Sequence, residues 1–117
     1  MKESQFVTTK IKPLLAELRF KVKKHAEKFS TGWPDLSAVH FPDGRTIYIE
    51  AKVAPNECTK LQFAELRELA QYGADCYIIT LMHKPETTYI EKVEATGEKY
   101  WIPLQTFIDK YKGGKTK

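Results

Sequence analysis

The sequence has no long apolar segment: nothing in its 117 residues approaches the ~20 consecutive apolar residues that a membrane-spanning helix needs. No apolar run of the secretory type follows the first residues. There are only two cysteines, Cys58 and Cys76, which form neither a disulfide framework nor a CxxC pair. No glycine-rich phosphate loop is present. These absences exclude membrane, disulfide-scaffold and ATPase classes, and we expect a cytoplasmic protein without a nucleotide cofactor.

The histidines also lack the spacing of zinc ligands, and we expect them at the surface or in loops: His25, His40 and His83.

Charge of one sign is scarce in parts of the chain. Residues 1–28 carry eight Lys/Arg against three Glu, a net charge of +5, and residues 29–109 carry seven against twelve, a net charge of −5. Residues 110–117 add four Lys and no acid. Cationic ends around an acidic middle suit a polyanion such as nucleic acid, although a solvated surface explains them equally well.

Hydrophobic spacing and turn residues divide the chain into helices and strands. Apolar residues three and four apart predict helices over 3–18, with an interruption at Pro13, over 60–72, and from Pro103 onward. Apolar alternation or continuous apolar runs predict strands over 20–23, 36–41, 46–53 and 76–81, and an edge strand over 87–93. The order helix, three strands, helix, strand, with a short C-terminal strand/helix extension, indicates a mixed α/β domain. We expect one domain over 1–112 and a flexible basic tail over 113–117.

Two acids and a lysine carry the strongest chemical pattern. Asp35 opens one expected strand, Glu50 lies on the next, and a hairpin through Asp43-Gly44 brings these strands together. Two carboxylates held close repel each other, and a divalent cation such as Mg²⁺ or Mn²⁺ relieves that repulsion. Lys52 is two residues from Glu50, so it leaves the same face of the strand, where it can stabilise developing negative charge or orient a water.

The same residues have an ordinary interpretation, a solvated strand face that carries an ion pair. Pro-Asp by itself is a common turn dipeptide, and a second copy, Pro42-Asp43, is fully explained by the turn that Gly44 completes. The combined order and spacing of the two motifs favours the metal site over this alternative.

The chain resembles the PD-(D/E)xK nuclease superfamily, and within it the VRR-NUC type, which includes small stand-alone phage and bacterial proteins. The matching text is Gly32-Trp33-Pro34-Asp35, a hairpin, Glu50-Ala51-Lys52, then a helix with Gln62 near its start. The resemblance implies a restriction-endonuclease-like core and Mg²⁺-dependent hydrolysis of DNA, in a bacterial or phage-infected cell. It implies that Asp35, Glu50 and the backbone carbonyl of Ala51 are metal ligands. It also implies that Lys52 positions or activates the attacking water and supports the transition state.

Gln62 and one further acid complete the expected site. The resemblance places Gln62 near the attacking water or Lys52, whereas Thr59-x-x-Gln62 is also a capping box that explains Gln62 locally. Family members often carry another acid, usually a glutamate on the first helix. The candidates for this acid are Glu3, which we favour, Glu27 next, and Glu17.

DNA is the expected partner of the basic residues. Contacts with it are expected from Lys21, Lys23, Lys24, Lys28 and Arg45. Tyr48, Trp33 and Trp101 are aromatic groups able to stack or wedge, although core or interface packing is the expected role of the two tryptophans.

The leading hypothesis is a metal-dependent endonuclease acting on branched DNA such as Holliday junctions. Because one small subunit with one site must pair to cut two strands symmetrically, we expect a homodimer. The alternatives are a non-cleaving DNA-binding or inhibitory module on the same fold, and an interaction domain whose motif match is accidental.

Overall fold

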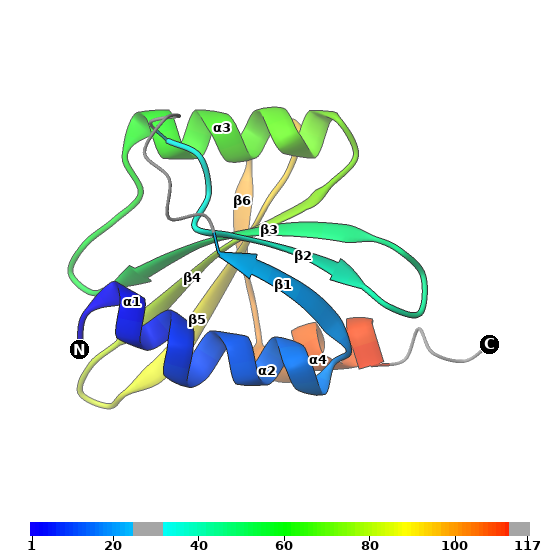
Figure 1. Cartoon of the computed structure of the whole chain (residues 1–117). Coiled ribbons are helices and arrows are strands. Elements are labelled where there is room, and N and C mark those ends of the chain that lie inside the picture. The colour runs from blue at the N-terminus through cyan, green and yellow to red at the C-terminus, as the bar shows by residue number, and fades with distance from the viewer. Residues whose placement is uncertain (25–31, 113–117) are drawn as a thin grey trace.

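The computed structural model describes residues 1–24 and 32–112, and it has three layers. A sheet lies in the middle, α3 (Lys60–Gln71) covers one face, and the N-terminal helices and α4 (Leu104–Lys112) lie on the other (Figure 1). The predicted mixed α/β class with a central sheet flanked by helices is confirmed. Among the described helices, none is long and apolar enough to cross a membrane.

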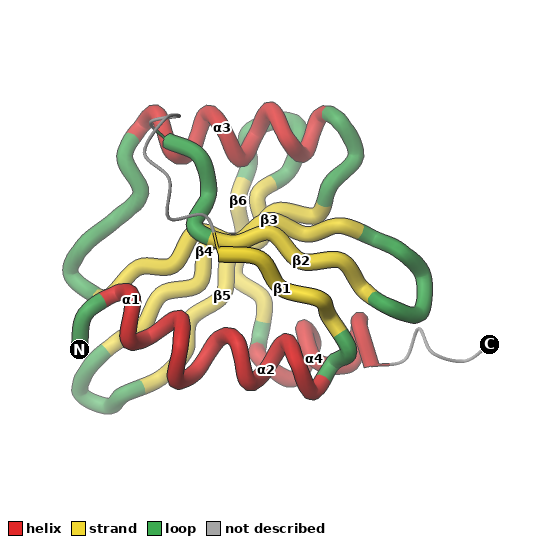
Figure 2. The backbone as a smooth tube through the Cα atoms, in the orientation of Figure 1, coloured by secondary structure: helices red, strands yellow, loops and turns green. Residues whose placement is uncertain are grey.

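Within the described residues the sheet has six strands, which lie in chain order (Figure 2). They are β1 (Phe20–Lys24), β2 (Leu36–His40), β3 (Thr46–Val53), β4 (Asp75–Met82), β5 (Thr87–Val93) and β6 (Lys99–Ile102). Neighbours are antiparallel except β3 and β4, which are parallel and are connected through α3. Parallel neighbours require such a crossover, whereas the antiparallel ones need only short turns.

Residues 87–93 form a strand with the predicted bounds, but the prediction that this strand lies at the edge is wrong. β5 pairs with β4 on one side and with β6 on the other, so β6 is the edge. The four residues of β6, Lys-Tyr-Trp-Ile, show little alternation, and three of them are exposed. A strand this short, which lies between the Thr96-Gly97 turn and Pro103, has too few alternating residues to be predicted from the sequence.

The N-terminal helix is interrupted where Pro13 predicts it. It runs as α1 (Glu3–Phe6), a π-helical segment η1 (Val7–Ile11) and α2 (Lys12–Glu17). The backbone N–H of Lys12 donates to the carbonyl of Val7, five residues back. Proline has no N–H and cannot continue the regular bonding pattern, so the chain winds more widely before it and resumes with Pro13 in the first turn of α2.

Two apolar clusters hold the layers together. The larger lies between the sheet and the N-terminal helices with α4, and it includes Ile47, Ile49, Ala51 and Val53 of β3. The smaller lies under α3, around Leu66, Cys76, Ile78 and Val93. The alternation of β3 therefore places its apolar residues in the larger cluster, as predicted. Tyr48, Glu50 and Lys52 point to the opposite side, which we call the α3 face.

A polar network at the start of β4 joins that strand to α4. The hydroxyls of Tyr77 and Tyr111 lie 2.6 Å apart, and Tyr111 donates to Asp75 at 2.9 Å. Arg45 donates to the same Asp75 carboxylate at 3.1 Å. The buried hydroxyls are therefore paired, as burial of polar groups requires.

Candidate active site

The start of β2 and the end of β3 bring the two predicted acids together. Leu36 pairs with Ile49 in the antiparallel register. Extending this register by one residue places Asp35 opposite Glu50. The carboxylate of Asp35 accepts a hydrogen bond of 2.8 Å from the backbone N–H of Ala51. This bond fixes the side chain of Asp35 against β3, beside Glu50.

The loop before β2 is packed in a way that favours glycine. Gly32 has φ +91°, and a Cβ atom there would lie 2.8 Å from Cγ of Leu61, in the first turn of α3. A side chain would strain the backbone and collide with the helix. The Gly-x-Pro-Asp sequence thus lets the loop approach α3 closely just before Asp35. Trp33 makes an edge-to-face contact with Tyr48, with ring centroids 5.9 Å apart.

Glu50 and Lys52 form a buried ion pair on the α3 face. Their closest polar atoms, Oε2 of Glu50 and Nζ of Lys52, are 3.4 Å apart, and the residues are 2% and 7% exposed. This burial contradicts the alternative of a solvated strand face. Burying two charges has a large desolvation cost that their attraction need not repay, so the pair is weakly explained by stability alone.

Burial and mutual repulsion change the protonation of both acids. Burial first, and then the neighbouring charge of Asp35, raise the pKa of Glu50 to about 7, against the opposing effect of Lys52. The pKa of Asp35 is also raised, chiefly by burial, while the Ala51 hydrogen bond opposes the shift. Near neutral pH the pair therefore tends to hold a proton.

The residues present fit a hard divalent cation. Oε1 of Glu50 is buried and has no hydrogen-bond partner among the described residues. A buried polar atom without a partner costs about 1–3 kcal/mol, and a cation would remove that cost. Within the described ranges no group of three or more His, Cys, Asp or Glu side chains is placed to hold a metal ion, so Asp35 and Glu50 are the side-chain donors to consider, and the backbone carbonyl of Ala51 stays a prediction. An all-oxygen set suits Mg²⁺ or Mn²⁺.

Of the three candidate additional acids, the structure brings Glu3 near the pair. Its charge contributes to raising the pKa values of Asp35 and Glu50, and its Oε2 accepts from Nδ2 of Asn56 at 3.4 Å. Glu17 lies at the end of α2, in a pocket shared with Arg19 and α4. Glu27 lies outside the described residues.

Gln62 forms the capping box that the sequence also predicts. Its Oε1 accepts from the backbone N–H of Thr59 at 2.9 Å, and its own N–H donates to Oγ1 of Thr59 at 3.1 Å. The amide NH₂ of Gln62 is the group that this cap leaves for a second contact, so a role in the site remains a prediction.

The predicted DNA-contacting residues are only partly brought together. Lys21 and Lys23 are exposed on β1, and Lys23 pairs with Ser37, which pairs with Tyr48 on β3. Their side chains therefore share the α3 face with the acids. Arg45 is turned instead toward Asp75 near α4, away from the acids. The side chain of Lys24 and all of Lys28 lie outside the described part of the chain.

Two expectations about other residues are corrected. His40 is not at the surface: it is 1% exposed, its Nδ1 lies 2.9 Å from the accepting Oδ1 of Asp43, and its ring packs against Phe20 and Tyr111. Trp101 is 57% exposed on β6, so core packing is wrong for it, whereas interface packing stays a prediction. His40 is buried by residues far from it in the sequence, Phe20 of β1 and Tyr111 of α4, which no local pattern indicates.

A cleft that no motif indicates lies beside the acids. It has a volume of about 460 Å³ and is lined by the chain after β3 and by residues of β4, β5 and β6. Its residues are far apart in the sequence and ordinary in type, so only the register of the strands brings them together.

Comparison with known proteins shows the fold. No protein-family model and no curated protein matches the chain. Among solved structures it is similar to the 1.6 Å structure of Hjc, a Holliday junction resolvase from the archaeal hyperthermophile Archaeoglobus fulgidus. The TM-score is 0.59 at 16% sequence identity, covering 89% of this chain and 90% of that chain. Hjc has the PD-(D/E)xK nuclease fold, so the predicted restriction-endonuclease-like fold is confirmed, whereas the VRR-NUC type stays a prediction.

Proposed function

We propose that this chain is a metal-dependent DNA endonuclease that hydrolyses phosphodiester bonds in branched DNA, such as Holliday junctions. The observation that carries the proposal is the buried set of Asp35, Glu50 and Lys52, in which Oε1 of Glu50 has no partner among the described residues. A structural role would favour full pairing of such a set. The fold neighbour Hjc is a Holliday junction resolvase, and this supports the choice of substrate.

Each side chain has a separate task in this proposal. Asp35, Glu50 and the carbonyl of Ala51 would hold Mg²⁺ or Mn²⁺, which would polarise the phosphate and lower the pKa of the attacking water. Lys52 places its ammonium where negative charge develops on the phosphate. The amide NH₂ of Gln62 orients the water, and Glu3 adds negative charge beside the pair.

The basic residues supply the contact with the DNA backbone. Lys21 and Lys23 lie on the α3 face, which is the face that carries the acids, and we include Lys24 and Lys28 in the same role. Arg45, which pairs with Asp75 on the other side of the sheet, would contact DNA only away from the acids. A homodimer would place two sites on the two strands to be cut. The action on DNA would be in the cytoplasm of a bacterial or phage-infected cell.

The proposal is tested by incubating the protein with supercoiled plasmid and with a synthetic four-way junction, in Mg²⁺, Mn²⁺ or EDTA. We expect nicking and junction cleavage that require the metal and are lost in Asp35→Ala and Lys52→Ala. Asp43→Ala is the matched control because it removes the aspartate of the second Pro-Asp dipeptide, in the β2–β3 turn. Gel shifts without cleavage in any metal would favour the non-cleaving DNA-binding or inhibitory module. Absence of any shift at low salt would refute both.

A further inference from the structure

The cleft beside the acids begins one strand away from Glu50 and Lys52. In the β3–β4 register, Glu50 pairs with Ile78 and Lys52 with Thr80, and both partners line the cleft. Neighbouring strands are about 4.8 Å apart, so the cleft starts directly next to the charged pair. Cys58, also in its lining, has a pKa raised by burial and then by the charge of Glu50.

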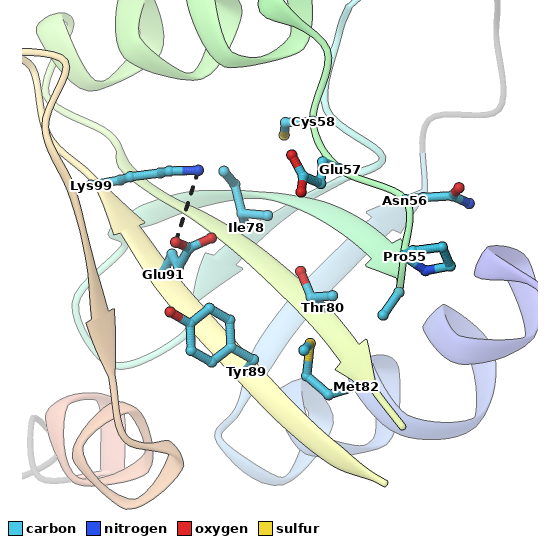
Figure 3. A pocket seen from close by; sticks show the side chains of 11 residues that line it. Pro55, Asn56, Glu57, Cys58, Ile78, Thr80, Met82, Tyr89, Glu91 and Lys99 are labelled. Atoms are coloured by element: carbon cyan, nitrogen blue, oxygen red, sulfur yellow. Dashed lines mark ion pairs between the residues drawn. The ribbon is translucent and has the colours of Figure 1, made fainter. Parts of the chain in front are cut away.

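One side of the cleft is apolar and includes an exposed aromatic ring. Tyr89 of β5 is 36% exposed and pairs with Thr80, and Met82 is 38% exposed. Both side chains stand on the same face of the sheet and line the cleft with Ile78 (Figure 3). This geometry offers a flat, accessible ring beside a strip of apolar floor, which is what a stacked base requires.

The other side of the cleft is polar and carries more negative than positive charge. Glu91 lies 3.9 Å from Lys99, with the two side chains pointing toward each other above the sheet (Figure 3), and Glu57 contributes a second carboxylate. With two carboxylates and one ammonium in its lining, the cleft disfavours a phosphate. A carboxylate next to an aromatic ring suits an uncharged group that carries hydrogen-bond donors, such as the exocyclic amino group of a nucleobase.

We infer that this cleft receives an unpaired base of the DNA next to the cleaved phosphate, with the base stacked on Tyr89 and its amino group donating to Glu91. This inference rests on the proposed function, because the acids define where the phosphate lies. The volume of the cleft, about 460 Å³, is within the range of small-ligand pockets, about 300–1,000 Å³. The substrate class is therefore DNA with an unstacked base at the cleavage position, in preference to an undistorted duplex.

The test measures binding without cleavage, by fluorescence anisotropy in EDTA at low salt. Three labelled DNAs are compared: a perfect duplex, the same duplex with a one-adenine bulge, and the same duplex with an abasic bulge. The abasic DNA keeps the distortion and the phosphates but lacks the base. We expect the wild-type protein to bind the adenine bulge roughly 5- to 150-fold more tightly than the abasic bulge, the range expected for one stacking contact.

Two substitutions at one position separate stacking from folding. Tyr89→Ala should remove the preference for the adenine bulge, and Tyr89→Phe should keep it because the ring remains. Tyr72→Ala, at the end of α3, is the matched control, since Tyr72 is 82% exposed and does not line the cleft. Thermal unfolding of each variant shows whether it is folded, and a bulge containing 2-aminopurine reports the stacking directly through its fluorescence.

The outcomes distinguish this inference from the proposed function. Equal binding of the adenine and abasic bulges by the wild-type protein, or persistence of the preference in folded Tyr89→Ala, would overturn the base subsite even if the protein cuts DNA. A base preference that depends on Tyr89 in a protein that cuts no DNA would support the subsite and overturn the nuclease. Binding to none of the three DNAs would overturn both.

Discussion

The ammonium nitrogen of Lys52 lies 3.4 Å from Oε2 of Glu50, with 9% and 2% of the two side chains exposed. Oε1 of the same glutamate is buried and has no partner among the described residues. Lys52 thus neutralises only part of the charge that Asp35 and Glu50 carry when both are ionised. A proton can supply the remainder near neutral pH, because the pKa of Glu50 is raised to about 7.

The first prediction concerns the stability of the metal-free protein. The pKa of Glu50 is raised from 4.5 to about 7, so between these values the folded state binds more protons than the unfolded state. The stability that Glu50 contributes should therefore be fully present below about pH 4.5 and be lost as the pH rises through about 7, by at most about 3 kcal/mol. Urea unfolding in EDTA at several pH values measures this decline.

The control for this decline is Glu50→Gln, which has the shape of the acid without its titration. It should flatten the pH dependence and be the more stable protein at about pH 8. A decline that is equally steep in this variant would show that other groups cause it, and would contradict the raised pKa of Glu50.

The second prediction concerns metal binding measured without DNA. Mg²⁺ or Mn²⁺ should raise the unfolding temperature, because a ligand of the folded state at 100 times its Kd adds about 3 kcal/mol. The increase should be larger at about pH 8 than at about pH 6, since the ion must displace the proton held by Glu50.

Differential scanning fluorimetry measures the metal effect, with Glu86→Gln as a control at an exposed acid. Asp35→Asn and Glu50→Gln should lose the response, and Glu86→Gln should keep it. A response of unchanged size in both site variants would place the metal elsewhere.

The third prediction separates the two roles of Gln62. Gln62→Ala removes half of the capping box and should lower the free energy of unfolding by about 1 kcal/mol. Gln62→Glu keeps an oxygen for the N–H of Thr59, so its stability should stay near that of the wild type. It lacks the amide NH₂, however, and DNA cleavage should fall at least about tenfold, the loss of about 1.4 kcal/mol of transition-state stabilisation. Full activity in a stable Gln62→Glu variant would leave Gln62 as a cap alone.

The fourth prediction concerns the basic face. Lys21→Ala and Lys23→Ala should each weaken binding to all DNA sequences and reduce the slope of log K against log[salt] by about 1. Lys12→Ala is the matched control, because Lys12 is exposed on α2, on the other side of the sheet. A titration of binding against NaCl provides the slopes, and equal changes in all three variants would show that the contact is not specific to β1.

Sequence reasoning recovered the order of the elements and most of their bounds. β3 was predicted over the residues it occupies, because strict alternation over eight residues leaves one consistent register. The end strand β6 was missed, and β5 was misassigned to the edge, since four residues with little alternation do not reveal a pairing partner. Pro13 correctly marked a break, but the π-helical form of that break depends on bonding across the whole helix.

The sequence by itself determined which residues can share a strand face, and hence that Glu50 and Lys52 leave β3 together, away from its apolar side. That result follows from the two-residue period of a strand and needs no knowledge of the rest of the chain. Only the tertiary structure decided that this face is buried, that Asp35 is fixed there by the N–H of Ala51, and that Tyr89 and Glu91 form a cleft next to it. These facts depend on strand order and on the helix above the sheet, which join residues far apart in the sequence and so leave no local pattern.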